Sequence, residues 1–140
     1  MNQVFVDTWA WYALADQTDA DHELAQLANE DLLDAGYTFI TTNYVLDEAL
    51  TLIRYNVNHA AAVKFWHTLQ QLIAARLVIL VRVDEDQETA AWQIFEQYAD
   101  QEFSYTDCTS FAVMRVLKLT HVFTGDGDFA TMGFTVVPAV

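Results

Sequence analysis

Short runs rich in β-branched and aromatic residues alternate along the whole chain with longer stretches that have the apolar spacing of helices. Strands separated by helices pair in parallel through right-handed crossovers, so this alternation predicts an α/β fold, a three-layer α/β/α sandwich with a central, mainly parallel sheet. With one proline and four glycines among 140 residues, no stretch has the composition of a linker, and we expect a single domain, 1–140. The predicted strands, roughly five in number, are 4–6, 37–41, 77–83, 121–124 and 134–137.

Residues that favour helix ends mark the boundaries of the predicted helices. Asp84 and Gln87 have the spacing of a capping box, and Ser104 and Asp107 repeat it before the next helix. Gly36 fits the left-handed residue that follows a helix end. Two further helices have a candidate N-cap, which is Thr42 or Asn43 in one and Asn58 in the other.

Apolar positions predict which segments are buried. The strand 77–83 is rich in Leu, Val and Ile, so we expect it to be buried. In the helix after it, Phe95 belongs to an apolar stripe that is expected to face inward. Trp66 and Trp92 also lie in amphipathic helices, which favours packing in the core or in a dimer over stacking on nucleobases.

The charge balance limits the possible partners. The chain has 20 acidic and 6 basic side chains, a net charge of -14. Lys and Arg supply most sequence-independent affinity for nucleic acids, so an anionic substrate would need positive charge from metal ions, a basic partner or a second subunit. A lone cysteine excludes an internal disulfide and favours a reducing cytoplasm. No apolar run approaches the roughly 18 residues of a membrane span, so we expect no membrane insertion.

Four carboxylates lie where a predicted strand meets the next helix or turn, or near the start of a helix. The carboxyl ends of parallel strands share one edge of the sheet, so these acids are expected to converge there. Clustered carboxylates bind hard divalent cations such as Mg²⁺ or Mn²⁺, which phosphodiester hydrolysis commonly uses. The pattern therefore favours a metal-dependent nuclease with Asp7, Glu48, Asp107 and Asp126 as its acids.

Each of the four acids also has a structural explanation. Asp7 could cap the helix that begins at Thr8, and Asp107 could be the reciprocal member of a capping box with Ser104. Asp126 lies between two glycines and fits an ordinary turn, and Glu48 could be a solvated helix residue. Local spacing alone leaves these alternatives open.

Four segments of the chain resemble, in order, the motifs of PIN domains, and in particular of VapC-type toxin nucleases. They are Val4–Thr8 (VFVDT), Thr41–Leu50 (TTNYVLDEAL), Ser104–Asp107 (SYTD) and Phe123–Phe129 (FTGDGDF). The resemblance runs from the first predicted strand to the last. It implies an Mg²⁺- or Mn²⁺-dependent endoribonuclease that acts on RNA, is usually paired with a small antitoxin, and is often a homodimer. The net charge of -14 favours an antitoxin with a basic tail.

The resemblance also ranks the candidate site residues. Thr8 matches a hydroxyl residue near the site, and Thr124 matches the threonine of the last motif. Asp128 falls where relatives vary and is a secondary candidate, whereas Asp47 lies about 100° around the helix from Glu48 and should point elsewhere. The acids that correspond to the catalytic and metal-binding set are Asp7, Glu48, Asp107 and Asp126.

Two positions depart from the family pattern. Trp9 stands where relatives commonly have a small residue, so it could narrow the mouth of the pocket or stack on a base. Gly127 stands where relatives often have a basic residue, which removes a candidate phosphate contact. Both departures bear on the choice of substrate more than on metal binding.

Other functions remain open from the sequence. A catalytically silent module could use the acidic pocket to bind a basic peptide, and a stand-alone PIN nuclease could act without an antitoxin. A phosphatase of the Asp-x-Asp type would need an acid at Trp9, which excludes that class. A receiver domain would need a lysine near the last strand, and we find none there.

Overall fold

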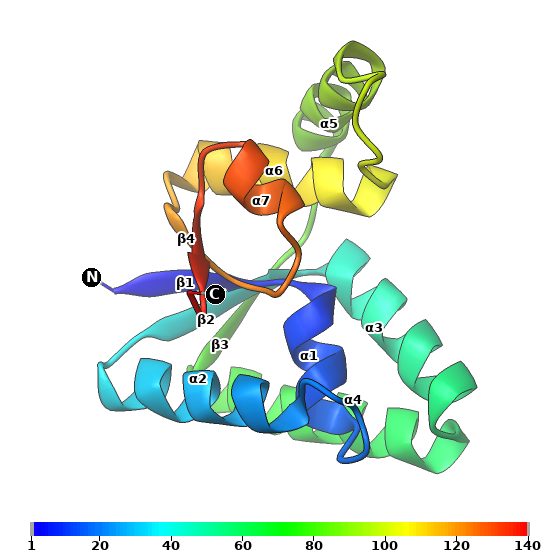
Figure 1. Ribbon diagram of the computed structural model, residues 1–140, viewed down its shortest axis with the longest axis vertical. Helices are drawn as coiled ribbons and strands as arrows, with labels where there is room; N and C mark the ends of the chain where they lie inside the picture. Colours follow the sequence, from blue (N-terminus) through cyan, green and yellow to red (C-terminus); the bar gives the residue numbers. More distant parts are fainter. Residues whose placement is uncertain (1, 140) are drawn as a thin grey trace.

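A five-stranded, fully parallel sheet forms the centre of the molecule, and helices cover both of its faces (Figure 1). The computed structural model describes residues 2–139. The strand order is β3-β2-β1-β4-β5, so β1 is central, and the predicted α/β/α sandwich is confirmed. The elements are β1 (Gln3–Val6), α1 (Thr8–Ala15), α2 (His22–Asp34), β2 (Thr38–Thr42), α3 (Asn43–Asn56), α4 (His59–Ala74), β3 (Val78–Val81), α5 (Glu85–Gln97), α6 (Tyr105–Leu117), β4 (His121–Phe123), α7 (Asp128–Thr131) and β5 (Thr135–Val137).

The helices divide between the two faces according to the strand order. The chain moves outward from β1 to β2 and β3, and then crosses back to β4 on the other side of β1. In Figure 1, α1, α2 and α4 accordingly lie on one side of the sheet, and α6 and α7 lie on the other. The helix α6 is the most enclosed of them, since every residue from Asp107 to Met114 is buried. An acid at the start of α6 is therefore held by a rigid, buried element.

Local sequence signals set several element boundaries as expected. Thr42 caps α3 by accepting a hydrogen bond from the Val45 backbone N–H at 3.1 Å. Asn58 caps α4 in the same way. Gly36 has a φ of 80° after α2, a conformation that glycine adopts without steric cost. The capping boxes predicted for α5 and α6 are both present.

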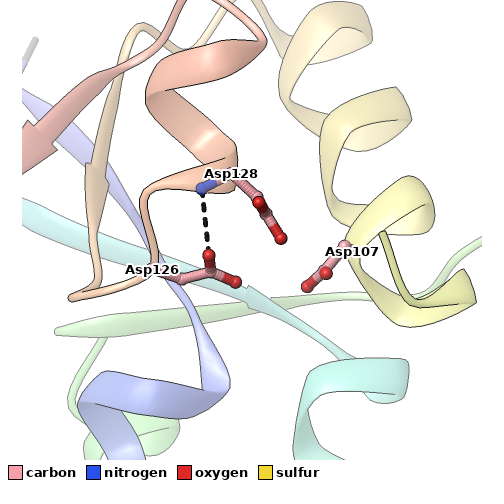
Figure 2. Close-up of side chains that lie close together, drawn as sticks. All are labelled: Asp107, Asp126 and Asp128. Carbon is pink, nitrogen blue, oxygen red and sulfur yellow. Dashed lines mark hydrogen bonds between the residues drawn. The ribbon is translucent and has the colours of Figure 1, made fainter. Parts of the chain in front are cut away.

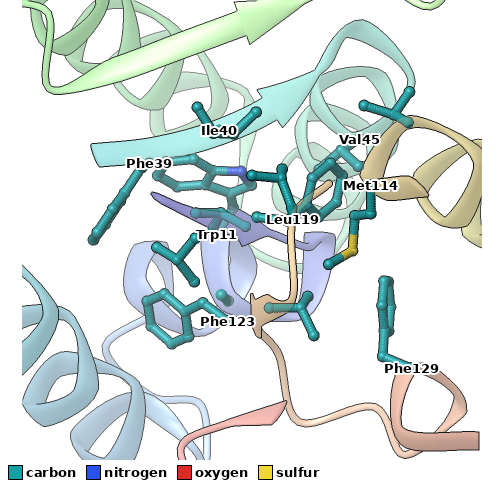
Figure 3. Close-up of a cluster of buried hydrophobic side chains, with 14 of the residues drawn as sticks. Trp11, Phe39, Ile40, Val45, Met114, Leu119, Phe123 and Phe129 are labelled. Atoms are coloured by element: carbon teal, nitrogen blue, oxygen red, sulfur yellow. The ribbon is translucent and has the colours of Figure 1, made fainter. Parts of the chain in front are cut away.

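Aromatic and aliphatic side chains fill the space between sheet and helices (Figure 3). Phe39 of β2 and Phe123 of β4, the two neighbours of the central strand, meet edge to face with ring centroids 6.3 Å apart. Phe111 of α6 makes a similar contact with Phe129 of α7, at 4.9 Å. This packing fixes α7, and with it the preceding turn, against α6.

Two predictions about burial are wrong, and a third is narrowed. The strand 77–83 is shorter, Val78–Val81, and forms an edge of the sheet, where Ile79 is 44% exposed. Phe95 does not face the core, since it is 41% exposed. Trp66 and Trp92 are 42% and 52% exposed, so they do not pack in the core of this chain, and packing in a dimer, the other role predicted for them, stays a prediction. In each case an apolar pattern indicated a buried side chain, but neighbouring elements cover only part of the pattern, since Val78 and Ile94 are buried while Ile79 and Phe95 are not.

No helix in the described part of the chain has both the length and the apolar character needed to cross a membrane.

Candidate metal centre

Asp7 directly follows the central strand β1, at the carboxyl edge of the sheet. It occupies the N-cap position of α1, yet its side chain makes no capping hydrogen bond. Instead, its Oδ2 accepts a hydrogen bond from Thr124 Oγ1 at 2.9 Å, and its backbone N–H donates to the Phe123 carbonyl at 3.2 Å. Helix capping therefore does not explain this acid, which is only 4% exposed.

Thr124 connects Asp7 to the turn that follows β4. Its hydroxyl donates to Asp7 and also accepts a hydrogen bond from the backbone N–H of Asp126 at 3.0 Å. Asp126 Oδ1 in turn accepts a hydrogen bond from the backbone N–H of Asp128 at 2.9 Å (Figure 2). The turn explanation for Asp126 is thus correct, and the same turn brings its carboxylate to the edge of the sheet where Asp7 lies.

Asp107 lies in the first turn of α6 and serves the helix and the candidate site at once. Its Oδ2 accepts a hydrogen bond from the Ser104 backbone N–H at 3.1 Å, while its own N–H donates to Ser104 Oγ at 3.0 Å. The capping box fixes the carboxylate in one orientation. Oδ1 takes part in none of the hydrogen bonds formed among residues 2–139, so it remains available to a ligand.

Asp107, Asp126 and Asp128 converge (Figure 2). One carboxylate oxygen from each lies within 4.8 Å of the other two. Asp128 begins α7, and the turn at Asp126 folds it back toward α6. Its place in this cluster was underrated by sequence reasoning. The available signal was the Asp-Gly-Asp spacing, because a turn held by the first aspartate places the second beside it.

Glu48 and Asp7 lie outside this group of mutually close oxygens but act on it through their charges. Glu48, half-buried on α3, raises the pKa of Asp107, and Asp107 raises the pKa of Asp7. Asp47 is exposed, in agreement with its predicted orientation away from the site. Thr8 is buried, and its Oγ1 has no hydrogen-bond partner. A buried hydroxyl without a partner beside Asp7 fits a site whose ligand completes its hydrogen bonding.

Asp7 and two carboxylates of the cluster lie in an environment that disfavours their negative charge. Burial, followed by the charge of Asp107, raises the pKa of Asp7 to about 7. Burial also raises the pKa of Asp107 to about 6, with a further contribution from Asp126. The pKa of Asp128 is raised by burial and by Asp126. Buried carboxylates that repel one another are stabilised by a cation, so the donor set fits a hard divalent ion.

Comparisons with known proteins agree with this geometry. The PIN domain family matches residues 4–135 of the chain. The 23S rRNA-specific endonuclease VapC20 of Mycobacterium tuberculosis is 36% identical over 137 residues, which cover 96% of this chain and 97% of that protein. The crystal structure of Mycobacterium tuberculosis VapC20, described as a sarcin-ricin loop cleaving toxin, superposes with a TM-score of 0.81 at 34% identity and covers 94% of this chain and 96% of that one.

A more distant structure shows the same fold. VapBC2 from Rickettsia felis, solved with a DNA fragment from its promoter, has a TM-score of 0.66 at 9% identity and covers 96% of both chains. The Mycobacterium tuberculosis protein, in contrast, matches this chain in sequence as well as in structure over nearly its whole length. The chain therefore belongs to the PIN domain family, as an endoribonuclease of the VapC toxin type.

Proposed function

We propose that this endoribonuclease cleaves a ribosomal RNA by means of Mg²⁺ or Mn²⁺ bound at the carboxyl edge of the sheet. The observation that carries the proposal is the convergence of three carboxylate oxygens within 4.8 Å. The name of the Mycobacterium tuberculosis relative, a 23S rRNA-specific endonuclease, supports the substrate class. An RNA of this kind would place the enzyme in the cytoplasm. We assign catalysis and metal binding to Asp7, Glu48, Asp107, Asp126 and Asp128.

The chain's own residues prepare this site in different ways. Ser104 orients Asp107 through the capping box, and Thr124 holds Asp7 and Asp126 together through one hydroxyl. Glu48 reaches toward the same edge from α3 and adds negative charge without being fully buried. A bound divalent ion would lower the pKa of a water for in-line attack on the phosphodiester and offset the charge that develops on phosphate.

Ribonuclease assays on matched variants test this assignment. We expect Asp107→Asn and Asp128→Asn to reduce cleavage of a ribosomal RNA stem-loop by at least about 100-fold, since each removes a charged ligand oxygen. Asp47→Asn removes the same charge from an exposed position and should leave cleavage unchanged. Cleavage should also stop with EDTA and return with Mg²⁺ or Mn²⁺.

Three outcomes would contradict different parts of the proposal. Undiminished cleavage by well-purified Asp128→Asn would remove that residue from the site. A wild-type chain that binds a basic peptide but neither Mn²⁺ nor RNA would instead support the silent acidic-pocket alternative. Cleavage of generic RNA without preference for the ribosomal stem-loop would overturn the substrate class and leave the metal site in place.

We also propose that a small antitoxin with a basic tail controls the enzyme. The net charge of -14 favours a basic partner, and the distant structure from Rickettsia felis is a VapBC2 assembly. A largely apolar cavity of about 570 Å³ offers a further contact surface, with Trp11, Phe65 and Leu69 in its walls and Lys64 at its lining. Co-expression with a neighbouring small open reading frame should yield a complex, and failure to co-purify would favour a stand-alone nuclease.

Finally, we propose that the chain forms a homodimer. Two exposed apolar side chains of α4, Val63 and Trp66, support this proposal, since they share a shallow groove with Leu50 of α3 and a monomer seldom leaves such side chains grouped in water. Light scattering coupled to size-exclusion chromatography should give twice the mass of 15.9 kDa. Trp66→Glu should shift the enzyme to monomer, and a monomeric wild type would contradict the proposal.

A further inference from the structure

The indole of Trp9 packs directly against the backbone of Gly125. A Cβ atom added to Gly125 would lie 2.3 Å from Cε2 of Trp9 and 2.6 Å from both Cζ2 and Nε1. Distances below 3.0 Å are essentially never seen for real Cβ atoms, so any side chain at this position would displace the indole or the turn. Gly125 is therefore required for the close approach of an aromatic ring to the backbone.

This contact joins the two segments that carry the candidate metal ligands. Trp9 follows Asp7 by two residues in the first turn of α1. Gly125 is the single residue between Thr124 and Asp126, so it lies within the turn whose two hydrogen bonds connect Asp7, Thr124 and Asp126. Both hydrogen bonds depend on one hydroxyl, and the indole covers the backbone directly beside it. Displacement of the turn would thus disturb Asp7 and Asp126 together.

We propose that Trp9 is a positioning residue of this nuclease, whose indole holds the Gly125 backbone so that Asp126 stays in register with Asp7 for cation binding. The inference rests on the proposed metal-dependent function. Half-buried and packed against the core, the ring acts through the turn and not as a ligand. This role also explains why Trp9, a large residue, lies opposite a glycine at position 125.

The first experiment compares two glycines that flank the same aspartate. Gly125→Ala should weaken Mn²⁺ binding, measured by calorimetry at pH 8, by about 10- to 100-fold, the usual effect of losing a residue that orients a ligand. Gly127→Ala is the matched control, because a Cβ there meets nothing within 4 Å and φ is -66°. Mn²⁺ affinity should therefore be unchanged in Gly127→Ala. Equal affinities for the two variants would overturn the proposal.

The second experiment tests whether the effect of Gly125 passes through Trp9. Trp9→Ala alone should also weaken Mn²⁺ binding about 10-fold or more, whereas Trp92→Ala, which removes an exposed indole from α5, should not. In the Trp9→Ala background, Gly125→Ala should lower the Mn²⁺ affinity by less than about threefold, because the added methyl group no longer meets an indole ring. If the two single-variant losses of Mn²⁺ affinity simply multiplied in the double variant, the residues would act independently, which would contradict a role for their contact.

A third readout separates positioning from base stacking and from misfolding. At saturating Mn²⁺, Trp9→Ala should keep the wild-type KM for RNA, while the Mn²⁺ concentration needed for half-maximal cleavage rises. A raised KM with unchanged Mn²⁺ affinity would assign the indole to the nucleobases instead. If Gly125→Ala does not fold, recovery of a cooperative thermal transition in Trp9→Ala/Gly125→Ala supports the contact, and its absence counts against it.

The Mn²⁺ measurements need no RNA, so the two proposals can fail separately. A wild type whose Mn²⁺ binding depends on Trp9 and Gly125 but that cleaves no RNA would refute the proposed function alone. A wild type that binds no Mn²⁺ would refute both.

Discussion

The replacement Asp7→Asn isolates the electrostatic strain that the candidate metal centre places on the metal-free fold. Asp7 is 4% exposed, and burial together with the charge of Asp107 raises its pKa from 3.8 to about 7. Asparagine has nearly the same shape, and its side-chain carbonyl can still accept the hydrogen bond from Thr124. The change therefore removes a buried charge while leaving the packing intact.

The sign of the pH dependence follows from proton binding. Between pH 4 and pH 7, folded Asp7 holds a proton that the unfolded chain has released, so the stability it contributes is complete below pH 3.8 and is lost as the pH rises through 7. Since one pKa unit corresponds to about 1.4 kcal/mol, the ionised carboxylate costs the metal-free fold about 4 kcal/mol at pH 8. This magnitude is an upper limit for the gain from Asp7→Asn.

Urea unfolding in EDTA at pH 4.5 and pH 8 measures this difference. Asp7→Asn should be more stable than wild type at pH 8 by about 2 to 4 kcal/mol, and the difference should shrink at pH 4.5. Asp47→Asn, which removes an exposed charge, should show neither effect. Addition of Mn²⁺ at pH 8 should stabilise wild type and leave Asp7→Asn unchanged.

Two results would refute this reasoning. If Asp7→Asn were no more stable than wild type at pH 8 in EDTA, the carboxylate would not be electrostatically strained. If Mn²⁺ stabilised both proteins equally, Asp7 would not contribute to cation binding.

Three further replacements test individual contacts of the site and the fold. Thr124→Val removes the hydroxyl that lowers the pKa of Asp7, so more of the Asp7 carboxyl is protonated at pH 7. Calorimetry should show Mn²⁺ binding weakened about 10- to 100-fold at pH 7 and partly recovered at pH 8.5. Ser104→Ala should cost about 1 kcal/mol in urea unfolding, because the Asp107 backbone N–H loses its acceptor, Ser104 Oγ. It should also weaken Mn²⁺ binding, because a frayed cap no longer fixes the Asp107 carboxylate that the Ser104 backbone N–H holds; unchanged binding would show that the cap does not orient the carboxylate. Gly36→Ala should lower the free energy of unfolding by about 1 kcal/mol, since only a residue without Cβ adopts a φ of 80° freely, and should leave the Mn²⁺ affinity unchanged. An unchanged urea midpoint would contradict this expectation.

Features that depend on neighbours along the chain agree closely with the sequence. The caps at Thr42, Asn58 and Ser104 and the turn at Gly36 involve groups within a few residues of each other, so local spacing is enough to predict them. The alternation of strands and helices is also read from successive short segments, and it predicted the parallel sheet correctly. Handedness and connection rules leave few other ways to pair such strands.

Burial, in contrast, depended on where each element came to lie. The strand β3 has the composition of a buried strand, yet the order β3-β2-β1-β4-β5 places it at an edge, with Ile79 exposed. An apolar run contains no information about how many neighbours its strand will have. Trp92 and Phe95 on α5 show the same limit, because the periodicity of a helix identifies an apolar face but not what covers it.

The sequence by itself determined the elements, their caps, the family and the acids at the strand ends, because each is encoded by short-range spacing or by motifs in order. Only the tertiary structure decided that Asp128 joins Asp107 and Asp126, that Thr124 links Asp7 to Asp126, and that Trp9 lies on Gly125. The last two of these contacts connect the segment that follows β1 with residues more than a hundred positions later. Their geometry, and the raised pKa values that follow from it, arise from the packing of β1 beside β4 and of α6 against α7, which no local pattern specifies.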